Sequence, residues 1–553
     1  MKNKLSLLLI LGILGIISFY LILVILQIHK LFVGDEVDFV RAAEGIVTTG
    51  KPIYTGANNK TYIGLWHPTL YVNILALSFR FFGVHDWSAR IVSVAFTLLT
   101  LLVVYLITKH LNFSNFSKVL AIFIFLLNPL IVQGSILVDI DNSALMFFIT
   151  LFVYAYLKLD KTMKNLVLLA ILFALTLWTK ISTPPVLILG IFIYHVLNRE
   201  YRDALLESTI IGFIGCFLFL ITWFSYCAFL DLPFPQPFIH NISYLSHGDS
   251  LHYILTHLWG FKNILFWATP FFLLLILAIS QSRMKFYCKN RKLITIDFLV
   301  IVGLLIFFEY LIVGSYQTAD FPRYFIPMMP FFSIASAYYF ERVRELERRD
   351  LHALVLVLVI TVVYLLLWSS DPLLVDRVIF NEKSLHKIAE ETAVVTAQYI
   401  IPFVIPYIIL KILRVRNAFI LSIAVPLLLC SIYINAIQVG ADYNTNYLYG
   451  ERGMKNTIDY LSSRVNSSDI VIARKDVAYY LKVREFYRLP ETPKEFGELM
   501  NKKHVKYIVV NKEGHFTSLK YANVLQLIDS TCELDKEFGD FKIYYTGKCR
   551  RTV

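Results

Sequence analysis

Charged residues are scarce in this sequence. They make up 17% of its 553 residues, while hydrophobic residues make up 57% and the mean hydropathy is +0.63. Soluble domains contain about 25% charged residues. A single soluble core cannot bury so much apolar surface, which excludes an ordinary water-soluble protein. The solvent for most of this chain is therefore a lipid bilayer.

Several other patterns are missing. The six cysteines show no metal-ligand spacing, and neither an internal repeat nor a low-complexity tract occurs. The first apolar run, Leu5–Gln27, is too long for a signal peptide and lacks a small-residue cleavage site, so we interpret it as a retained anchor. A net charge of +12 would suggest nucleic-acid binding in a soluble protein, but here the basic residues lie between apolar runs.

Apolar runs long enough to cross a bilayer recur from Leu5 to Gln438. Each run must be helical, because a bilayer offers no partner to open backbone polar groups. The positive-inside rule assigns six basic loops to the cytoplasm: 109–118, 158–164, 199–202, 283–292, 342–349 and 411–416. Loops poorer in Lys and Arg are expected outside, at 33–66, 231–262, 314–322 and 371–391.

One apolar segment, Leu70–Phe82, is short for a span and carries Arg80. If it crossed the membrane, the direction of every later helix would be reversed. All six basic loops would then lie outside, against the positive-inside rule. We therefore predict a helix in or near the outer interface. The resulting fold class is a polytopic α-helical membrane protein of the plasma membrane, with about thirteen spans, a cytoplasmic N-terminus and an outer C-terminus.

Hydropathy falls toward the C-terminus, where the pattern changes. Short β-branched runs alternate with helical patterns, which indicates a small α/β domain. The expected strands are 469–473, 505–511 and 541–545, and the expected helices are 454–465 and 494–503. We therefore divide the chain into a transmembrane domain, 1–440, which includes a first outer loop, 31–87, and an extracytoplasmic domain, 441–553. Outside the cytoplasm, Cys532 and Cys549 can form a disulfide that closes a hairpin.

Three carboxylates, Asp35, Glu36 and Asp38, follow the first span at the outer surface. The simpler interpretation is a helix cap, with Asp35 as the N-cap of the amphipathic stretch Val37–Val47. The functional interpretation is that one of them is a general base, because partial desolvation raises the basicity of a carboxylate. Both interpretations can hold for the same residue.

A second acidic pair, Asp139 and Asp141, lies in an otherwise apolar hairpin on the same side. A cap is again the simpler interpretation, because Asp141 can begin a helix over 142–159. Two acids near membrane depth are costly, however, and this favours a function for the pair.

Four cations collect at the same face: His67, Arg90, Lys180 and Arg323. Each has an aromatic neighbour, and each one alone is most often an interface anchor. As a set they can hold a lipid phosphate. Arg323, which Tyr324 follows, is the strongest candidate, because a guanidinium binds phosphate oxygens in bidentate fashion.

In order along the chain, these residues resemble the C superfamily of membrane glycosyltransferases (GT-C), in the branch that contains protein O-mannosyltransferases and the aminoarabinose transferase acting on lipid A. The resemblance extends from the first span to about Phe340. Its four pieces are Asp35-Glu36, His67-Pro68-Thr69-Leu70-Tyr71 leading to Phe82–Arg90, the Asp139/Asp141 hairpin, and Arg323-Tyr324-Phe325-Ile326-Pro327. Each piece is weak alone, but their order with this topology is fairly specific.

The resemblance implies inverting transfer of a sugar from a polyprenyl phosphate to an acceptor hydroxyl of a protein, lipid or glycan outside the cytoplasm. It assigns the catalytic base to Asp35 and a donor-phosphate contact to Arg323, and it leaves open whether Asp139 or Asp141 is the second-loop acid. No cofactor is required, because a sugar phosphate already has a fair leaving group, although the carboxylates could bind a divalent cation.

The chain departs from the lipid A branch at two positions. His67 stands where that branch has a Lys, and Asp38, three places after the base, stands where it has an Arg. Both changes weaken the binding of phosphate, which argues against a lipid A substrate. Neither change affects the base.

Three other functions stay open. A transporter or flippase would use intramembrane charges along a substrate pathway, but the chain lacks the repeats and matching broken helices typical of one. An oligosaccharide transferase or ligase is disfavoured because the outer domain has no Trp-Trp-Asp type motif. A non-catalytic scaffold could use its α/β domain to recruit a partner.

Overall fold

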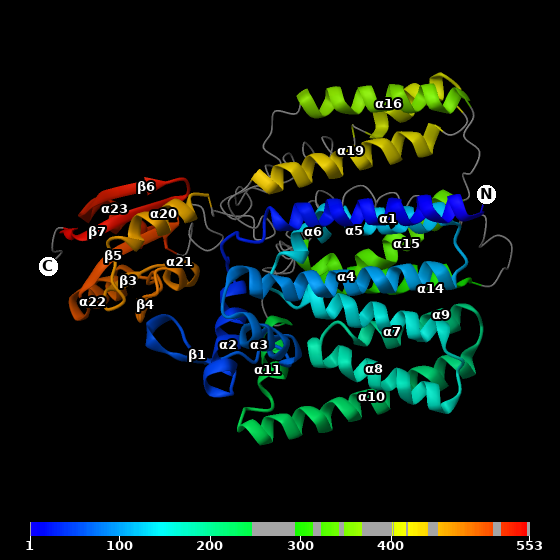
Figure 1. Cartoon of the computed structure of the whole chain (residues 1–553). Coiled ribbons are helices and arrows are strands. Elements are labelled where there is room, and N and C mark those ends of the chain that lie inside the picture. The colour runs from blue at the N-terminus through cyan, green and yellow to red at the C-terminus, as the bar shows by residue number, and fades with distance from the viewer. Residues whose placement is uncertain are drawn as a thin grey trace.

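The computed structural model separates a helical bundle from a small mixed domain at one end of it (Figure 1). It describes residues 2–245, 293–312, 322–341, 348–367, 401, 403–415, 418–440, 452–511 and 521–549. Four of the expected loops lie wholly or mostly outside these residues: 283–292, 314–322, 342–349 and 371–391. The outer loop expected at 231–262 is described only as far as residue 245.

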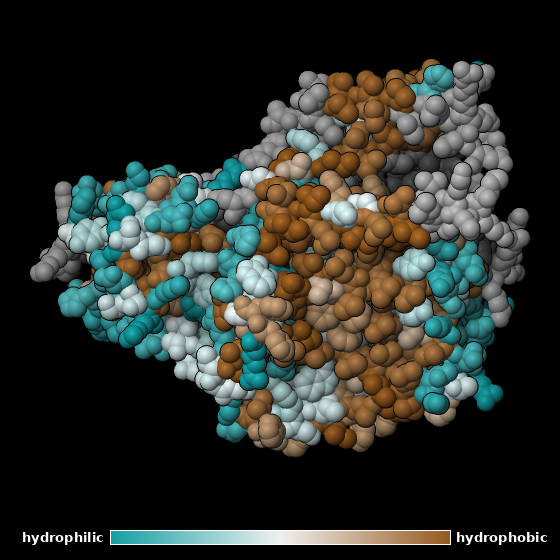
Figure 2. Space-filling model, viewed as in Figure 1, coloured by the Kyte–Doolittle hydropathy of each residue, from teal (hydrophilic) through white to brown (hydrophobic). Residues whose placement is uncertain are grey.

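The bundle consists of long apolar helices that run in roughly the same direction (Figure 1). Their bounds are α1 Lys2–Ile25, α4 Asp86–His110, α5 Asn115–Leu126, α6 Pro129–Ser135, α7 Met146–Lys158, α8 Met163–Thr179, α9 Pro185–Leu197, α10 Tyr201–Leu230, α14 Thr295–Ile312, α15 Met329–Glu341, α16 Arg348–Leu367 and α19 Ala418–Gly440. An apolar band covers the bundle, and hydrophilic residues lie at both of its ends (Figure 2). This pattern matches a bilayer flanked by water on two sides.

A test of helix length and apolarity finds fewer membrane spans in the described residues than the sequence predicts for the chain. Within the described residues, α4 and α10 each qualify as a span. The pair α5 and α6 qualifies as a third span if counted together across its 59° bend. At that bend Asn128 caps α6 by accepting a hydrogen bond from Leu130 N at 2.9 Å, and Pro129 starts the new helix. The total of about thirteen spans stays a prediction.

The segment predicted as the first outer loop folds against the end of the bundle that lies nearest the C-terminal domain (Figure 1). Its elements are α2 Glu36–Thr49, β1 Ile53–Thr55, the 3-10 turn η1 Ala57–Asn59, β2 Thr61–Ile63 and α3 Leu70–Phe82. The helices confirm the two predictions made for the loop, an amphipathic helix beginning near Val37 and a helix over Leu70–Phe82. Strand β1 crosses α2 so closely that a Cβ on Gly45 would lie 2.2 Å from Ile53 O, so only glycine fits there. A further short helix, α11 Gln236–Leu245, follows α10.

The C-terminal domain is the α/β unit that the sequence predicts. Its five-stranded sheet has the order β4-β3-β5-β7-β6, with β4-β3-β5 parallel and the other pairs antiparallel. The bounds are α20 Met454–Ser462, β3 Ile470–Ile472, α21 Lys475–Tyr480, β4 Glu485–Tyr487, α22 Pro493–Lys502, β5 Val505–Asn511, α23 Ala522–Thr531, β6 Cys532–Phe538 and β7 Phe541–Cys549. The sequence patterns did not indicate α21, β4, α23 or β6.

The C-terminal domain packs directly on the first outer loop. Val33 and Ala57 of that loop share a buried apolar cluster with Val471 and Val477 of the domain. Tyr480 on α21 accepts a hydrogen bond from Phe32 N at 2.7 Å. The helix α21 therefore docks on the segment that immediately precedes Asp35.

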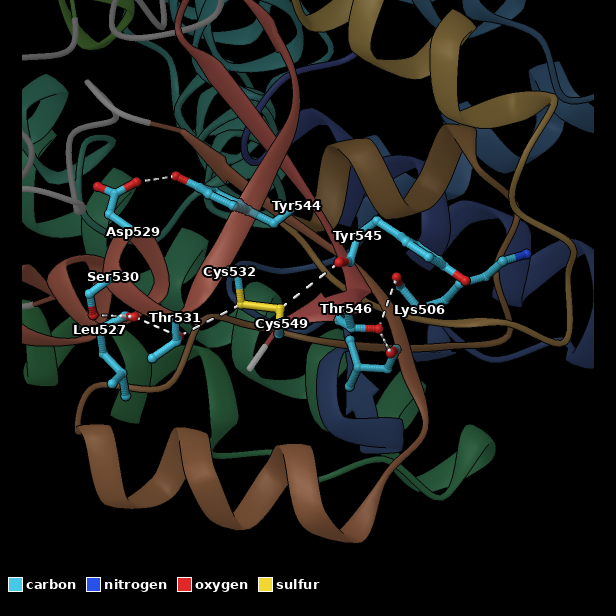
Figure 3. Close-up of a disulfide and its surroundings, with 11 residues drawn as sticks. Lys506, Leu527, Asp529, Ser530, Thr531, Cys532, Tyr544, Tyr545, Thr546 and Cys549 are labelled. Carbon is cyan, nitrogen blue, oxygen red and sulfur yellow. Dashed lines mark hydrogen bonds between the residues drawn. A yellow bond between two sulfur atoms is a disulfide. The ribbon is translucent and has the colours of Figure 1, made fainter. Parts of the chain in front are cut away.

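The expected disulfide joins Cys532 and Cys549, which pair across the antiparallel strands β6 and β7 (Figure 3). Asp529 beside it accepts a hydrogen bond from Tyr544, which ties α23 to β7 (Figure 3). The bond confirms the prediction and closes the hairpin at the edge of the sheet.

Alkylation under denaturing conditions tests this bond. We expect the peptides that contain Cys532 and Cys549 to take up iodoacetamide only after reduction, as followed by peptide mass spectrometry. Cys216, a free and exposed thiol, is the internal control and should be alkylated in both samples. Alkylation of both tail cysteines without reduction would contradict the disulfide.

Candidate active site

Asp35 lies at the start of α2, where the bundle meets the C-terminal domain. It occupies the N-cap position, but its carboxylate makes no capping hydrogen bond. One oxygen lies 2.9 Å from Arg323 Nη2, and the other lies 3.2 Å from Lys475 Nζ. The side chain remains 51% exposed. The capping interpretation therefore explains the backbone position of Asp35 but not its side chain.

The two cations decide the charge of Asp35. Burial by surrounding atoms raises the pKa of its carboxyl, but Lys475 and Arg323 together lower the pKa by more, so the net shift is downward. Burial lowers the pKa of Lys475, and Asp35 and Asp38 reverse that shift to a net rise. Asp35 is thus a carboxylate, and Lys475 an ammonium, at neutral pH.

The acidic hairpin of Asp139 and Asp141 lies beside Asp35. Arg323 Nε is 3.1 Å from Asp139 Oδ2, so the same guanidinium binds Asp35 and Asp139. Lys180 Nζ is 2.7 Å from Asp141 Oδ1. The two acids are also linked, because Asp139 Oδ1 accepts a hydrogen bond from Asp141 N at 3.1 Å. The structure therefore brings together Asp35, Asp139, Asp141, Arg323 and Lys180, as the sequence predicts.

Aromatic residues join the two ion pairs. Tyr324 follows Arg323 in the 3-10 turn η3 Pro322–Met328, and its ring lies 5.0 Å from the Arg323 guanidinium and 4.8 Å from Lys180 Nζ. Tyr310 on α14 donates a hydrogen bond to Asp141 at 2.8 Å and stacks on Tyr324. The faces of both rings are electron-rich, and Tyr310 also offers its hydroxyl to Lys180. These contacts stabilise the positive charges of Arg323 and Lys180 in the interior.

Arg90 and Glu36 lie behind this cluster. Both side chains are fully buried and lie 3.5 Å apart, and neither contacts Asp35. The Arg90 guanidinium donates to four backbone carbonyls, those of Ile28, Lys30, Leu31 and Ile136. Glu36 accepts from the backbone N–H groups of Val33 and Val138, each at 2.9 Å. These contacts hold the first outer loop to the acidic hairpin, which favours a positioning role for both residues.

His67 is close to the cluster but is not a third fixed cation. Burial, together with the positive charges of Lys180 and Arg323 and its neighbour His240, lowers the pKa of its imidazole well below the usual value. Its Nδ1 is buried and has no hydrogen-bond partner among the residues that the structure describes. A neutral imidazole can donate one hydrogen bond, and this is the role that remains for His67.

Sequence patterns missed Lys475, Tyr310 and Glu309. Glu309 accepts a hydrogen bond from Thr183 at 3.0 Å, and an acid in an apolar helix is a signal that could have been noticed. Lys475 had no such signal, because it stands in a charged stretch of a water-exposed domain. Its place near Asp35 depends on tertiary contacts.

A metal ion has no obvious cluster of ligands here. Within the described residues, the one group of three side chains placed to bind an ion is His195, Glu200 and Asp203. That group lies where α9 ends and α10 begins, far along the bundle from Asp35 (Figure 1). The outer carboxylates are engaged by Arg323, Lys180 and Lys475 instead.

Comparisons with known proteins bear on the fold of the chain. A family model described as dolichyl-phosphate-mannose-protein mannosyltransferase matches residues 66–226. ArnT from Cupriavidus metallidurans bound to undecaprenyl phosphate has a TM-score of 0.59 and 13% identity, and the match covers 98% of each chain. ArnT in the apo state has a TM-score of 0.57 and 14% identity, over 96% of this chain and 97% of that one.

The chain shares the fold of ArnT over nearly its whole length and matches the mannosyltransferase family model over residues 66–226. AglB from Archaeoglobus fulgidus, in complex with an inhibitory peptide and a dolichol-phosphate, has a TM-score of 0.48 and 11% identity, over 98% of this chain and 75% of that one. No curated protein sequence matches the chain. At these identities the two ArnT structures establish the fold alone, and the chemistry must be argued from this chain's own residues.

The Arg90 contacts predict a large effect on stability. Arg90→Lys should lower the free energy of unfolding by about 3–5 kcal/mol, because an ammonium cannot reach the carbonyls and Glu36 together and leaves buried groups unpaired. Thermal unfolding of the purified protein, followed by size-exclusion chromatography, measures the change. Arg80→Lys is the matched control, since Arg80 is exposed on α3. Equal unfolding midpoints for both variants would contradict the positioning role.

Proposed function

We propose that this chain is a GT-C glycosyltransferase that transfers a sugar, with inversion, from a polyprenyl-phosphate donor to an acceptor hydroxyl at the outer membrane face. The observation that carries the proposal is the half-exposed carboxylate of Asp35 between Arg323 and Lys475. Such a site combines a base that can reach a hydroxyl with cations that can bind a phosphate. The acceptor can be a protein, a lipid or a glycan.

The chemistry balances with side chains alone. Asp35 takes the proton of the acceptor hydroxyl as its oxygen forms a bond to C1 of the sugar. The bond from C1 to the phosphate oxygen breaks at the opposite face, and polyprenyl phosphate leaves with the electron pair. Asp35 then returns its proton to water. Fixed cations near the leaving oxygen stabilise the developing charge without reorganisation.

Each cation receives a role from its contacts. Arg323, stacked beside Tyr324, is the proposed main contact of the leaving phosphate, because its guanidinium is already near Asp35. Lys180 lies behind Tyr324 and adds positive charge from its pair with Asp141. We propose His67 as a neutral hydrogen-bond donor. Arg90, which the sequence placed in the same group, lies among backbone carbonyls and is proposed to hold the loops in position.

Asp139 is our proposal for the second-loop acid. It binds the same guanidinium as Asp35, whereas Asp141 binds Lys180 and Tyr310. By holding Arg323, Asp139 keeps the guanidinium within reach of both the base and a donor phosphate.

The proposed orientation has about thirteen spans, a cytoplasmic N-terminus and the site outside, in the plasma membrane. The basic loops 109–118, 158–164 and 199–202 follow α4, α7 and α9, and all three connections are at the end of the bundle away from the C-terminal domain (Figure 1). This arrangement supports an outer position for the domain 441–553 and for the site between it and the transmembrane domain 1–440.

Asp35→Asn tests the base. We expect transfer from a radiolabelled polyprenyl-phosphate sugar by purified protein to fall by about a hundredfold or more, because an amide cannot accept the proton. Binding of undecaprenyl phosphate should persist in this variant, since Arg323 remains. The matched control is Asp231→Asn, whose fully exposed carboxylate lies on the same side of the bundle.

Full transfer activity in Asp35→Asn would contradict the catalytic assignment. Movement of a solute across the membrane, without transfer from any lipid-linked sugar, would instead favour a transporter.

Chelation tests the metal question separately. We expect transfer by the purified protein to be unchanged after treatment with EDTA, because Arg323 and Lys180 already supply positive charge near the leaving group. The same rate assay, with Mg²⁺, Mn²⁺ or Zn²⁺ added back afterwards, provides the measurement. A loss that one of these ions restores would show that the outer carboxylates need a divalent cation.

A further inference from the structure

Lys475 is a residue of the C-terminal domain that reaches into the bundle's site. It opens α21, and its ammonium contacts Asp35 Oδ1 at 3.2 Å and also Asp38. Its neighbours anchor it there. Tyr480 donates a hydrogen bond to Asp86 at 3.0 Å, and Tyr479 donates one to Glu44 at 3.0 Å. The short helix is therefore fastened to the first outer loop at several points, and this fixes the backbone of Lys475 beside Asp35.

The present contacts conflict with the proposed role of Asp35. Arg323 occupies one of its oxygens, and Lys475 occupies the other. A carboxylate so paired is a poor base, because both cations stabilise its charged form and hold its pKa down. Loss of one of these cations to a donor phosphate would make Asp35 a stronger base for the acceptor hydroxyl, which can approach its exposed side.

Lys475 is the cation that can move. The Arg323 side chain is only 2% exposed, is paired with Asp139 and lies against Tyr324. The Lys475 side chain is 20% exposed, and its ammonium ends a flexible four-carbon chain. It also has a second partner, Asp38, whose other oxygen accepts a hydrogen bond from Tyr54 at 3.0 Å. After leaving Asp35, Lys475 would remain at the site through Asp38.

We propose that Lys475 binds the phosphate of the lipid-linked donor, and that it releases Asp35 when it does so. The inference rests on the proposed function, since it assigns a further residue to that donor site. The phosphodiester of an incoming donor carries one negative charge, as Asp35 does, and competes with it for the ammonium, and the phosphate that leaves after transfer carries more. Donor binding thus supplies the leaving group with a second cation and frees the base in the same step.

The C-terminal domain accordingly completes the donor site. In this arrangement the docking of α21 on residues 31–34 is a requirement for donor binding and not only a structural contact. A separate module that only recruits an acceptor would not need an ammonium beside the base.

Binding of undecaprenyl phosphate by the full-length purified protein tests the inference, with undecaprenol as the probe that lacks the phosphate. Lys475→Met should weaken binding of undecaprenyl phosphate by about tenfold, the loss expected for one charged hydrogen bond, and leave binding of undecaprenol unchanged. Lys475→Arg should retain most of the phosphate-dependent affinity. Lys455→Met is the matched control, because Lys455 is exposed on α20 of the same domain. Lys475→Gln is made in parallel, since it keeps a hydrogen-bond donor to Asp38 if the Met variant does not fold.

The outcomes separate the two claims. If wild-type protein does not prefer undecaprenyl phosphate over undecaprenol, the proposed function fails, and the inference fails with it. If wild-type protein shows the preference but Lys475→Met and Lys475→Gln show it equally, only the inference fails. Equal losses for both probes would indicate a structural role for Lys475 and would also overturn the inference.

Discussion

The buried guanidinium of Arg90 is the interaction on which the outer site depends. It binds carbonyls of the segment that leads from α1 to Asp35 and the carbonyl of Ile136 in the acidic hairpin. Glu36, next to Asp35 in sequence, neutralises it and binds the N–H of Val138, next to Asp139. Five fixed donors in one plane can hold two loops in register where an ammonium cannot. Arg90 and Glu36 therefore set the distance between Asp35 and Asp139, because they join the two loops that carry these acids.

In front of that support, opposite charges alternate. Lys475, Asp35, Arg323 and Asp139 form one connected series, and Tyr324 joins it to the pair of Lys180 and Asp141. Buried charges are tolerated only when they are paired, and each carboxylate of this series has a cation beside it. A phosphate that enters this series must replace existing partners. In the proposed reaction, binding of the donor and release of the base are then parts of one exchange, because Lys475 and Arg323 are the partners of Asp35.

Much of the fold was predictable because its signals are local. Hydropathy indicated an apolar helical bundle, and α3 begins and ends at the residues predicted for it. β-branched runs located β3, β5 and β7, and the outer setting suggested the bond between Cys532 and Cys549. The short elements α21 and β4 were missed, because three to six residues give too little periodicity to recognise. Span counting was less secure, because bent and short helices pass or fail a length criterion by a few residues.

The sequence by itself determined that the chain resides in a membrane and that its acids and Arg323 belong to one face, because hydropathy and charge asymmetry are properties of consecutive residues. Only the tertiary structure decided the partners. It separated Glu36 and Arg90, which join loops, from Asp35, which faces the site, and it paired Asp139 and not Asp141 with Arg323. It also brought Lys475 to Asp35 across 440 positions of sequence. An ion pair forms between groups that lie a few ångströms apart in space. A local sequence pattern does not indicate which distant residue the fold will bring that close.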